Sequence, residues 1–143
     1  MLIAHVIREK GAVVHTLPAA ATLEQAAKRL LEKRVGALVV LDGQGTVVGV
    51  FSERDLVREI ARGGASALTA PVGSAMSREV ITAQGEETID ECLARMTDRR
   101  VRHLPVVEDL KLIGIVSIGD LVKHRIAVVE AEAAAMQAYI TAQ

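Results

Sequence analysis

A serine and an aspartate three residues apart occur twice in this chain, as Ser52 with Asp55 and as Ser117 with Asp120. Each pair lies in the same nine-residue pattern, written "GVFSERDLV" in the first copy and "GIVSIGDLV" in the second. A hydroxyl and a carboxylate at this spacing can start a helix or hold a polar ligand. The spacing alone leaves both interpretations open.

In the structural interpretation, the serine is a helix N-cap and the aspartate completes a capping box that satisfies free N–H groups of the first turn. In the functional interpretation, the same helix N-terminus attracts a phosphate. The carboxylate then accepts two hydrogen bonds, which suits the paired hydroxyls of a ribose. Gly49 and Gly114, which precede the motifs, would let backbone and ligand approach closely.

The motif belongs to a longer internal repeat. "ATLEQAAKRLLEKRVGALVVLD" corresponds to "ETIDECLARMTDRRVRHLPVVE", and Thr22 matches Thr88 at an offset of 66 residues. Asp55 matches Asp120 at an offset of 65 residues. The lost residue falls where "DGQGTVVG" becomes "EDLKLIG". A hairpin turn tolerates such a change in length, so the repeat is structural.

Each copy is predicted to fold as β-α-β-β-α. Thr22 and Thr88 are typical helix N-caps, and apolar residues follow them at helical spacing. Short aliphatic runs then predict two strands of a hairpin, and Ser52 and Ser117 begin the second helices. The expected strands are 12–16, 37–42 and 45–51 in the first copy, and 79–83, 103–108 and 111–117 in the second.

Beyond Lys123 the chain is rich in alanine and glutamate, and the last helix is expected to continue. Its apolar residues are spaced 3, 4, 3 and 4 apart, at Ile126, Val129, Ala133, Met136 and Ile140. This row of side chains either packs on its own domain or pairs with a helix of a second chain.

Composition excludes several classes of function. A net charge of −1 and an aromatic content of 1% give neither a basic surface nor stacking platforms for nucleic acid. No stretch approaches the ~20 apolar residues of a membrane-spanning helix, and no signal peptide is evident, which predicts a cytoplasmic protein. The four histidines show no metal-binding spacing, and Cys92 is predicted to be a core residue. No catalytic arrangement is present, so we expect no enzyme.

The region from Ala4 to about Ala127 resembles a pair of CBS domains (a Bateman module), as found in stand-alone proteins of bacteria and archaea. "GVFSERD" and "GIVSIGD" match the family's G-φ-x-[ST]-x-x-D pattern, and "RVRHLPVV" matches its strand with a proline. The resemblance implies an α/β fold of α+β type, with two β-α-β-β-α repeats related by a pseudo-twofold axis. We place the repeats at 1–66 and 67–127, followed by a C-terminal helical extension at 128–143.

The resemblance also implies a set of ligand-binding residues in two clefts between the repeats. Asp55 and Asp120 would hold ribose hydroxyls, while Ser52, Ser117 and Arg54 would lie near phosphate. Backbone groups at two positions of each copy would read the base: His15, Thr16, Ile81 and Thr82. The second strand of the second copy would contribute Arg102, His103 and Pro105, and the counterpart of His103 in the first copy is the uncharged Ala37. Lys10 and Arg78, each ahead of a first strand, could approach a phosphate.

The resemblance implies a regulatory protein that senses energy or redox status. Its expected ligand is an adenine nucleotide such as AMP, ADP, ATP or NAD(H), with S-adenosyl compounds as further candidates. We expect a homodimer that acts through an unidentified effector protein, with no role for nucleic acid or a membrane. The cleft containing Asp120, Arg102 and His103 is predicted to bind anions more tightly. The alternative is a ligand-free structural module that only dimerises.

Overall fold

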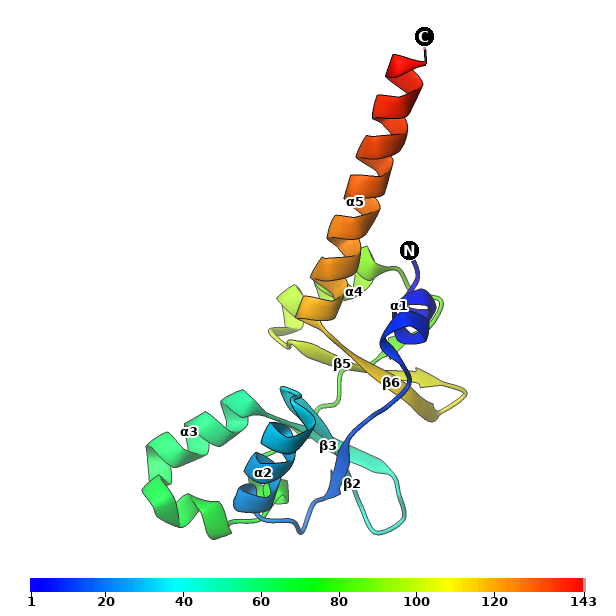
Figure 1. The fold of residues 1–143 in the computed structure, drawn as a ribbon. Helices are drawn as coiled ribbons and strands as arrows, with labels where there is room; N and C mark the ends of the chain where they lie inside the picture. The colour runs from blue at the N-terminus through cyan, green and yellow to red at the C-terminus, as the bar shows by residue number, and fades with distance from the viewer. Residues whose placement is uncertain (143) are drawn as a thin grey trace. The chain divides into compact units, whose positions relative to one another are not determined.

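The computed structural model of the chain describes residues 1–142. They form two compact units (Figure 1). The first unit is Val14–Val80, and the second unit combines Met1–Val13 with the chain from Ile81 onward. Each unit contains one three-stranded sheet and helices, as predicted for a mixed α/β protein with two repeats.

The first unit is a three-stranded sheet with two α-helices. Its strand order is β1-β2-β3, with β1 parallel to β2 and β2 antiparallel to β3. Two 3-10 turns, at Gly64–Thr69 and Val72–Ser74, close the unit. The elements are β1 (Thr16–Pro18), α2 (Leu23–Lys33), β2 (Ala37–Leu41), β3 (Val47–Ser52) and α3 (Glu53–Gly63).

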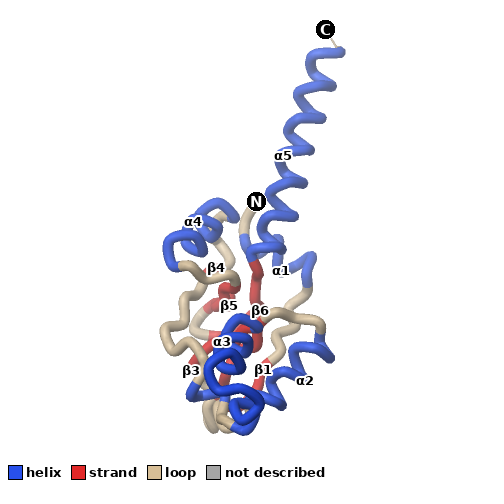
Figure 2. Tube along the Cα trace, turned by 90° about the vertical axis from the view of Figure 1, so that its left-hand side faces the viewer, coloured by secondary structure: helices blue, strands red, loops and turns tan. Residues whose placement is uncertain are grey.

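The second unit repeats this topology, with the order β4-β5-β6 and the same parallel and antiparallel pairings. Its three strands are labelled in Figure 2. It contains β4 (Ala83–Gln84), α4 (Ile89–Arg99), β5 (His103–Glu108), β6 (Lys111–Ser117) and α5 (Ile118–Thr141). One further helix, α1 (Ile3–Lys10), comes from the start of the chain.

The helices begin where the sequence predicts. Thr22 accepts a hydrogen bond from the Gln25 amide at 3.2 Å, and Gln25 accepts one from the Thr22 amide at 2.9 Å. Thr88 and Glu91 repeat this capping box at the start of α4. Satisfying these amides fixes the first turn of each helix and therefore its direction relative to the sheet.

Each sheet has one face covered by helices. In the second unit, Leu104 and Val106 of β5 and Val116 of β6 pack with Cys92 and Leu121. In the first unit, the corresponding residues of β2 and β3 pack around Phe51, which is fully buried. The cores are aliphatic, as the low aromatic content requires.

The compact units do not follow the repeat boundaries placed at residues 66 and 67. Helix α1 lies at the start of the range 1–66 but packs on β6 and α5 of the second unit. Residues 75–77 lie near the start of the range 67–127 but pack on β3, where Ser77 and Val50 exchange two backbone hydrogen bonds. Each sheet is therefore completed by the segment that leads into the other repeat.

This arrangement corrects our expectation for the glycines. A Cβ at Gly114 would lie 2.5 Å from Cδ1 of Ile7, and one at Gly49 would lie 2.5 Å from Sδ of Met76. The space beside both glycines is occupied by the covering segments. The glycines therefore serve packing within each unit and not the approach of a ligand.

Two expected strands are also displaced. The first strand of each copy begins later than 12–16 and 79–83, because parallel pairing starts only at Thr16 opposite Val39 and at Ala83 opposite Val106. Helix α1 was not expected, although Ile3, Val6 and Ile7 have helical spacing and are buried.

The one-residue difference between the copies lies in the hairpin turn, as predicted. Six residues of β5 and seven of β6 are joined by Asp109 and Leu110 alone, with φ values of 49° and 65°. Two successive positive φ values are typical of a tight type I′ hairpin turn. The corresponding turn in the first unit contains Asp42, whose carboxylate accepts from the amides of Gln44 and Thr46.

Alanine at the two glycines is expected to have unequal effects. Gly49→Ala should lower the free energy of unfolding by about 1–3 kcal/mol, because the new Cβ also lies 2.8 Å from the Ser77 backbone oxygen, which hydrogen bonds hold in place. Gly114→Ala should cost less, since the Ile7 side-chain terminus can rotate away. Urea denaturation of both variants measures the difference, and equal losses would contradict it.

Candidate functional site

The Ser117–Asp120 pair forms a complete capping box at the start of α5. The Asp120 carboxylate accepts from the Ser117 amide at 2.8 Å, and Ser117 Oγ accepts from the Asp120 amide at 3.1 Å. The structural interpretation of this motif is therefore confirmed. A carboxylate has about four acceptor positions, so capping leaves it able to accept further bonds.

The same carboxylate holds a cation from the far end of the sequence. Lys10 Nζ lies 2.6 Å from Asp120 Oδ2 and donates to the Ile115 carbonyl at 2.9 Å. Lys10 is the last residue of α1, and the position of α1 against β6 and α5 brings its ammonium group to this point. The predicted phosphate contact and the predicted ribose contact are thus joined as an ion pair.

These contacts set the protonation of Asp120. Burial alone would raise the pKa of its carboxyl, but hydrogen bonds from Lys10 and Ser117 outweigh burial, and the pKa lies below its usual value. Asp120 is therefore ionised at neutral pH. Its charge stabilises the folded unit above the ordinary carboxyl pKa, and this contribution is lost as the pH falls through the lowered value.

Backbone pairing brings three other predicted residues to the strand that leads into this capping box. Antiparallel pairing of β5 with β6 puts His103 opposite Ser117 and Pro105 opposite Ile115. The amide of Ile118 donates to the Arg102 carbonyl at 2.8 Å, which ties the start of β5 to the start of α5. The second unit therefore brings Arg102, His103, Ser117, Asp120 and Lys10 to one corner of its sheet.

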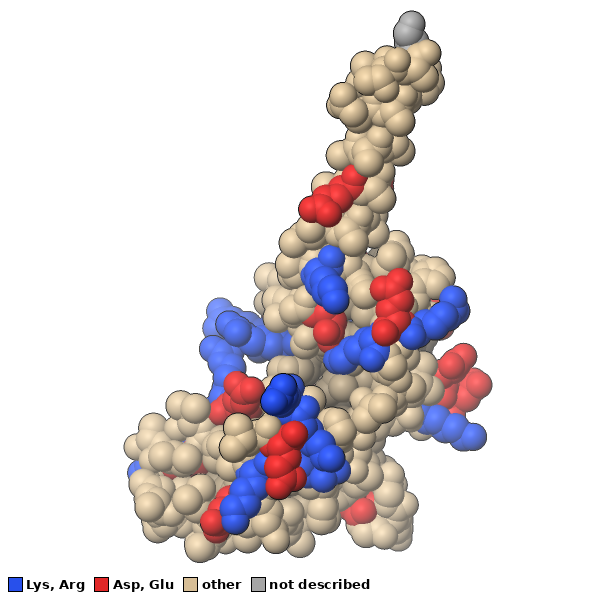
Figure 3. Space-filling model, in the orientation of Figure 1, with Lys and Arg blue, Asp and Glu red and all other residues tan. Residues whose placement is uncertain are grey.

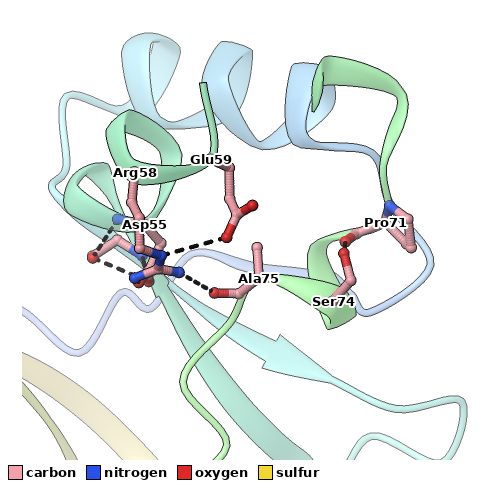
Figure 4. Close-up of polar contacts among 7 residues, drawn as sticks. Asp55, Arg58, Glu59, Pro71, Ser74 and Ala75 are labelled. Carbon is pink, nitrogen blue, oxygen red and sulfur yellow. Dashed lines mark hydrogen bonds and ion pairs between the residues drawn. The ribbon is translucent and has the colours of Figure 1, made fainter. Parts of the chain in front are cut away.

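The first unit has the same capping box but a different cation. Asp55 accepts from the Ser52 amide at 2.8 Å and from the Ser52 hydroxyl at 3.1 Å. Arg58 donates to Asp55 Oδ1 at 2.9 Å, to the Ala75 carbonyl at 2.9 Å and to Glu59 at 3.4 Å (Figure 4). Hydrogen bonding to Asp55 raises the pKa of Arg58 despite its partial burial. This cation is fixed at three points.

The remaining predicted residues of the first unit are more dispersed. Ala37 lies opposite Ser52 in the β2–β3 pairing, at the position of His103 in the other unit. Arg54 is exposed on the first turn of α3, and Arg78 donates to the Gly73 carbonyl at 2.9 Å. Partial burial, with Lys33 and Arg29 nearby, lowers the pKa of His15.

The strand proline makes the two units differ at the expected base-reading positions. In the first unit, the Val39 amide donates to the His15 carbonyl at 3.1 Å. Pro105 stands at the corresponding position and has no N–H, so it cannot make this bond to Ile81. As a result β4 has two residues where β1 has three.

In each repeat, an arginine on the helix after the first strand holds the chain at the start of that strand. Arg29 Nε donates to the Thr16 carbonyl at 2.9 Å, and Arg95 Nη1 donates to the Thr82 carbonyl at 3.0 Å. Arg95 also pairs with Glu87, and this hydrogen bond lowers the pKa of Glu87. A groove of about 740 Å³ in the second unit is lined by Ile81, Thr82, Glu91, Ala94, Arg95, Asp98 and Arg99.

Known proteins share this sequence pattern and this fold. The sequence matches the CBS domain family at residues 10–62 and again at 72–127. The chain belongs to the CBS domain family. It is 37% identical over 123 residues to the mitochondrial CBS domain-containing protein CBSX3 of Arabidopsis thaliana, covering 83% of this chain. The chain spans 60% of the length of that relative.

Solved structures of CBS-domain proteins have the same fold. A CBS-domain containing protein from Agrobacterium tumefaciens aligns with a TM-score of 0.85 and 40% identity, covering 87% of this chain and 92% of that chain. The CBS domain pair of protein MJ0100, solved in complex with 5′-methylthioadenosine and S-adenosyl-L-methionine, aligns with a TM-score of 0.76 at 24% identity, covering 86% and 94% of the respective chains. Proteins with CBS pairs are regulatory as a class.

Several residues of these CBS repeats were not found from the sequence. Arg29 and Arg95 occupy equivalent positions in the two repeats, and this repetition was a usable signal. Arg58 lies three residues after Asp55, on the same face of a helix. The pairing of Lys10 with Asp120 has no local signal, because 110 residues separate them.

The described residues contain neither a reactive cysteine nor a metal-binding cluster. Cys92 is fully buried, and burial raises the pKa of its thiol to about 11, so it is a core residue at neutral pH. Among residues 1–142, no three histidine, cysteine or acidic side chains are grouped closely enough to hold a metal ion. Within the same residues, no helix has the length and apolar character needed to span a bilayer.

Replacing Lys10 by methionine should raise the pKa of Asp120, because burial would then act without the ammonium group. The variant should lose stability relative to the wild type at neutral pH, and the difference should close as the pH falls through the lowered pKa of Asp120, where the wild-type carboxylate is protonated. NMR titration of the Asp120 carboxyl carbon and urea denaturation across pH test this, with Lys10→Arg as the charge-conserving control. Identical titration of Asp120 in wild type and variant would contradict it.

Proposed function

We propose that this CBS-family chain is a regulatory module that binds an adenosine-containing ligand, with the second unit as its tighter site. The observation that carries this proposal is the convergence of Ser117, Asp120, Lys10, Arg102 and His103 at one corner of the sheet. An ionised carboxylate beside a helix N-terminus and cationic or polar side chains matches the ribose and phosphate of a nucleotide. The MJ0100 complex supports this ligand class through a shared fold.

In this proposal Lys10 and Asp120 exchange partners on binding. The ribose hydroxyls take the carboxylate, and the Lys10 ammonium moves to the phosphate group. Lys10 suits this role because its side chain is long and its ammonium group is held by the Ile115 carbonyl and by Asp120 itself. Arg102 and His103 would add positive charge and hydrogen-bond donors next to the same phosphate.

The base would lie toward β4. Strands are about 4.8 Å apart, so the segment before β4 and the end of β6 lie about 10 Å apart across β5. Ile81 and Thr82 line the groove beside α4. Because Pro105 cannot donate to Ile81, the Ile81 carbonyl is spared the strand bond that its counterpart His15 makes. It can then accept from an exocyclic amine such as that of adenine.

The first unit is proposed to bind more weakly. Ser52, Asp55, His15 and Thr16 correspond to residues of the second unit, but Arg58 holds Asp55 and is itself fixed by the Ala75 carbonyl. To bind Asp55, a ligand would have to break its ion pair with Arg58, which several hydrogen bonds hold in place. To bind Asp120, it would have to break the ion pair with Lys10. The uncharged Ala37 takes the place of His103, and Arg54 and Arg78 would be the cations nearest to a phosphate.

Candidate ligands are AMP, ADP, ATP, NAD(H) and S-adenosyl compounds, which share the adenosine group that these residues would contact. Binding would favour one conformation of the protein to the extent that the ligand's affinity differs between conformations. We propose that a homodimer transmits this change to an effector protein and that the chain does not catalyse a reaction.

A ligand-free structural role is the second candidate, and a specific observation favours it. Both capping boxes are complete without a ligand, and each aspartate already has a cation. In this alternative the motifs only start helices and the module only dimerises.

Thermal unfolding with a panel of AMP, ATP, NADH and S-adenosylmethionine separates the two candidates. A ligand at about 100 times its dissociation constant should add about 2.7 kcal/mol to the free energy of unfolding. Guanosine monophosphate serves as the matched control for base recognition. No stabilisation by any adenosine compound would favour the structural candidate.

Asp55→Asn and Asp120→Asn distinguish the two units. Asparagine retains an acceptor for the capping box but removes the charge, so the fold should be preserved. Asp120→Asn should weaken nucleotide binding about tenfold or more, since a charge-assisted hydrogen bond contributes about 1.5–3 kcal/mol. Asp55→Asn should have a smaller effect. Titration calorimetry measures both, and equal losses would remove the proposed difference between the units.

A further inference from the structure

The outer half of α5 has no other element of its unit beside it. The helix has 24 residues and is therefore about 36 Å long. Only its first turns contact β6, α4 and α1, where Leu121 and His124 are buried. The rest extends beyond the unit (Figures 1 and 2). An isolated helix of about 15 residues is marginally stable in water, so packing on another surface must help to stabilise this segment.

Apolar side chains form one continuous row along α5. We call this row the α5 seam, and its exposed fractions range from 42% at Val122 to 67% at Met136, apart from the small Ala133. The spacing alternates strictly between 4 and 3 residues, which is the heptad pattern of a coiled coil. The members of the α5 seam are Val122, Ile126, Val129, Ala133, Met136 and Ile140.

The α5 seam faces away from its own unit. At 3.6 residues per turn, its mean direction lies about 100° around the helix from Leu121 and farther from His124. Leu121 is fully buried and His124 is 8% exposed, so they mark the side of α5 that contacts the unit. The alternative in which the row of apolar residues packs on its own unit is thus excluded by the exposure of Ile126, Val129, Met136 and Ile140.

Charges beside the α5 seam favour a second copy of the chain in parallel orientation. In a parallel pair each residue of the α5 seam lies opposite the same residue of the partner helix. Arg125 is at a g position of the heptad, and it then lies next to the partner's Glu130 at the e position of the following heptad. In an antiparallel pair that buries all six residues of the α5 seam, Glu130 would lie next to the partner's Glu130, and Glu132 next to the partner's Glu132. Isoleucine at the a positions Ile126 and Ile140 also suits a parallel two-stranded pair.

A lipid surface fits this helix less well. Helices that lie on membranes carry lysine and arginine on their polar face. Residues 126–141 contain no lysine or arginine, and their only charges are Glu130 and Glu132. Figure 3 shows the outer part of α5 largely without basic side chains on the visible face. Anionic phospholipid would repel these glutamates.

We propose that the α5 seam is an interaction surface that pairs with the α5 seam of a second copy, as a short parallel coiled coil. The two helices bury the exposed apolar row, and two symmetry-related ion pairs between Arg125 and the partner's Glu130 fix the orientation. This inference does not depend on ligand binding and holds for either candidate function.

Disulfide trapping in the full chain tests the register. Met136→Cys puts two d-position thiols within disulfide distance in a parallel pair, whereas Ala138→Cys, two residues on, lies on the outer face and is the matched control. Cys92 is buried and does not compete. Mild oxidation should cross-link Met136→Cys on the order of ten times faster than Ala138→Cys. Equal rates for both variants would overturn the proposal.

A charge exchange in the Met136→Cys background tests the orientation. Arg125→Glu should slow cross-linking about fivefold, by placing two acidic side chains together, and adding Glu130→Arg should restore it. Arg125 also lies 3.4 Å from Asp90, but loss of that contact would not be rescued by Glu130→Arg. Failure of the rescue would overturn the parallel pairing, and so would co-sedimentation of the protein with phosphatidylserine vesicles that abolished cross-linking.

Discussion

Each sheet in this protein has an apolar face that its own repeat covers only in part. The remaining cover comes from the segment that leads into the other repeat, α1 in the second unit and residues 75–77 in the first. This exchange explains why a glycine is needed in each third strand, since Ile7 and Met76 approach Gly114 and Gly49 too closely for a side chain. It also delivers Lys10 to Asp120. The fold and the candidate site therefore depend on the same packing.

The two repeats use one local motif for two different electrostatic arrangements. Both aspartates complete the capping box of a helix. Asp55 then binds an arginine on its own helix, fixed by the Ala75 carbonyl, whereas Asp120 binds a lysine from another helix. An arginine held by several hydrogen bonds is a rigid partner, while a lysine on a flexible stem can change partners. Although the two repeats are similar in sequence, the Asp55–Arg58 pair is therefore rigid, whereas the Asp120–Lys10 pair can exchange partners.

Local signals allowed the sequence to predict much of this fold. The caps at Thr22 and Thr88, the repeat and the shortened hairpin turn are all encoded within a few residues, and the structure confirms them. The neighbours of Gly114 and Asp120 could not be predicted, because their contacts with Ile7 and Lys10 join segments more than 100 residues apart. The effect of Pro105 could not be predicted, because it depends on the parallel register of β4 with β5, in which Ala83 pairs with Val106.

Helix α1 combines two properties in one short element. Its apolar side, with Ile3, Val6 and Ile7, belongs to the core of the second unit, and its last residue neutralises Asp120. When α1 separates from the sheet, the unit loses core packing and at the same moment exposes an uncompensated carboxylate. Local opening at the start of the chain is therefore coupled to the charge of the candidate site, so any molecule that takes over Asp120 alters how firmly this helix is held.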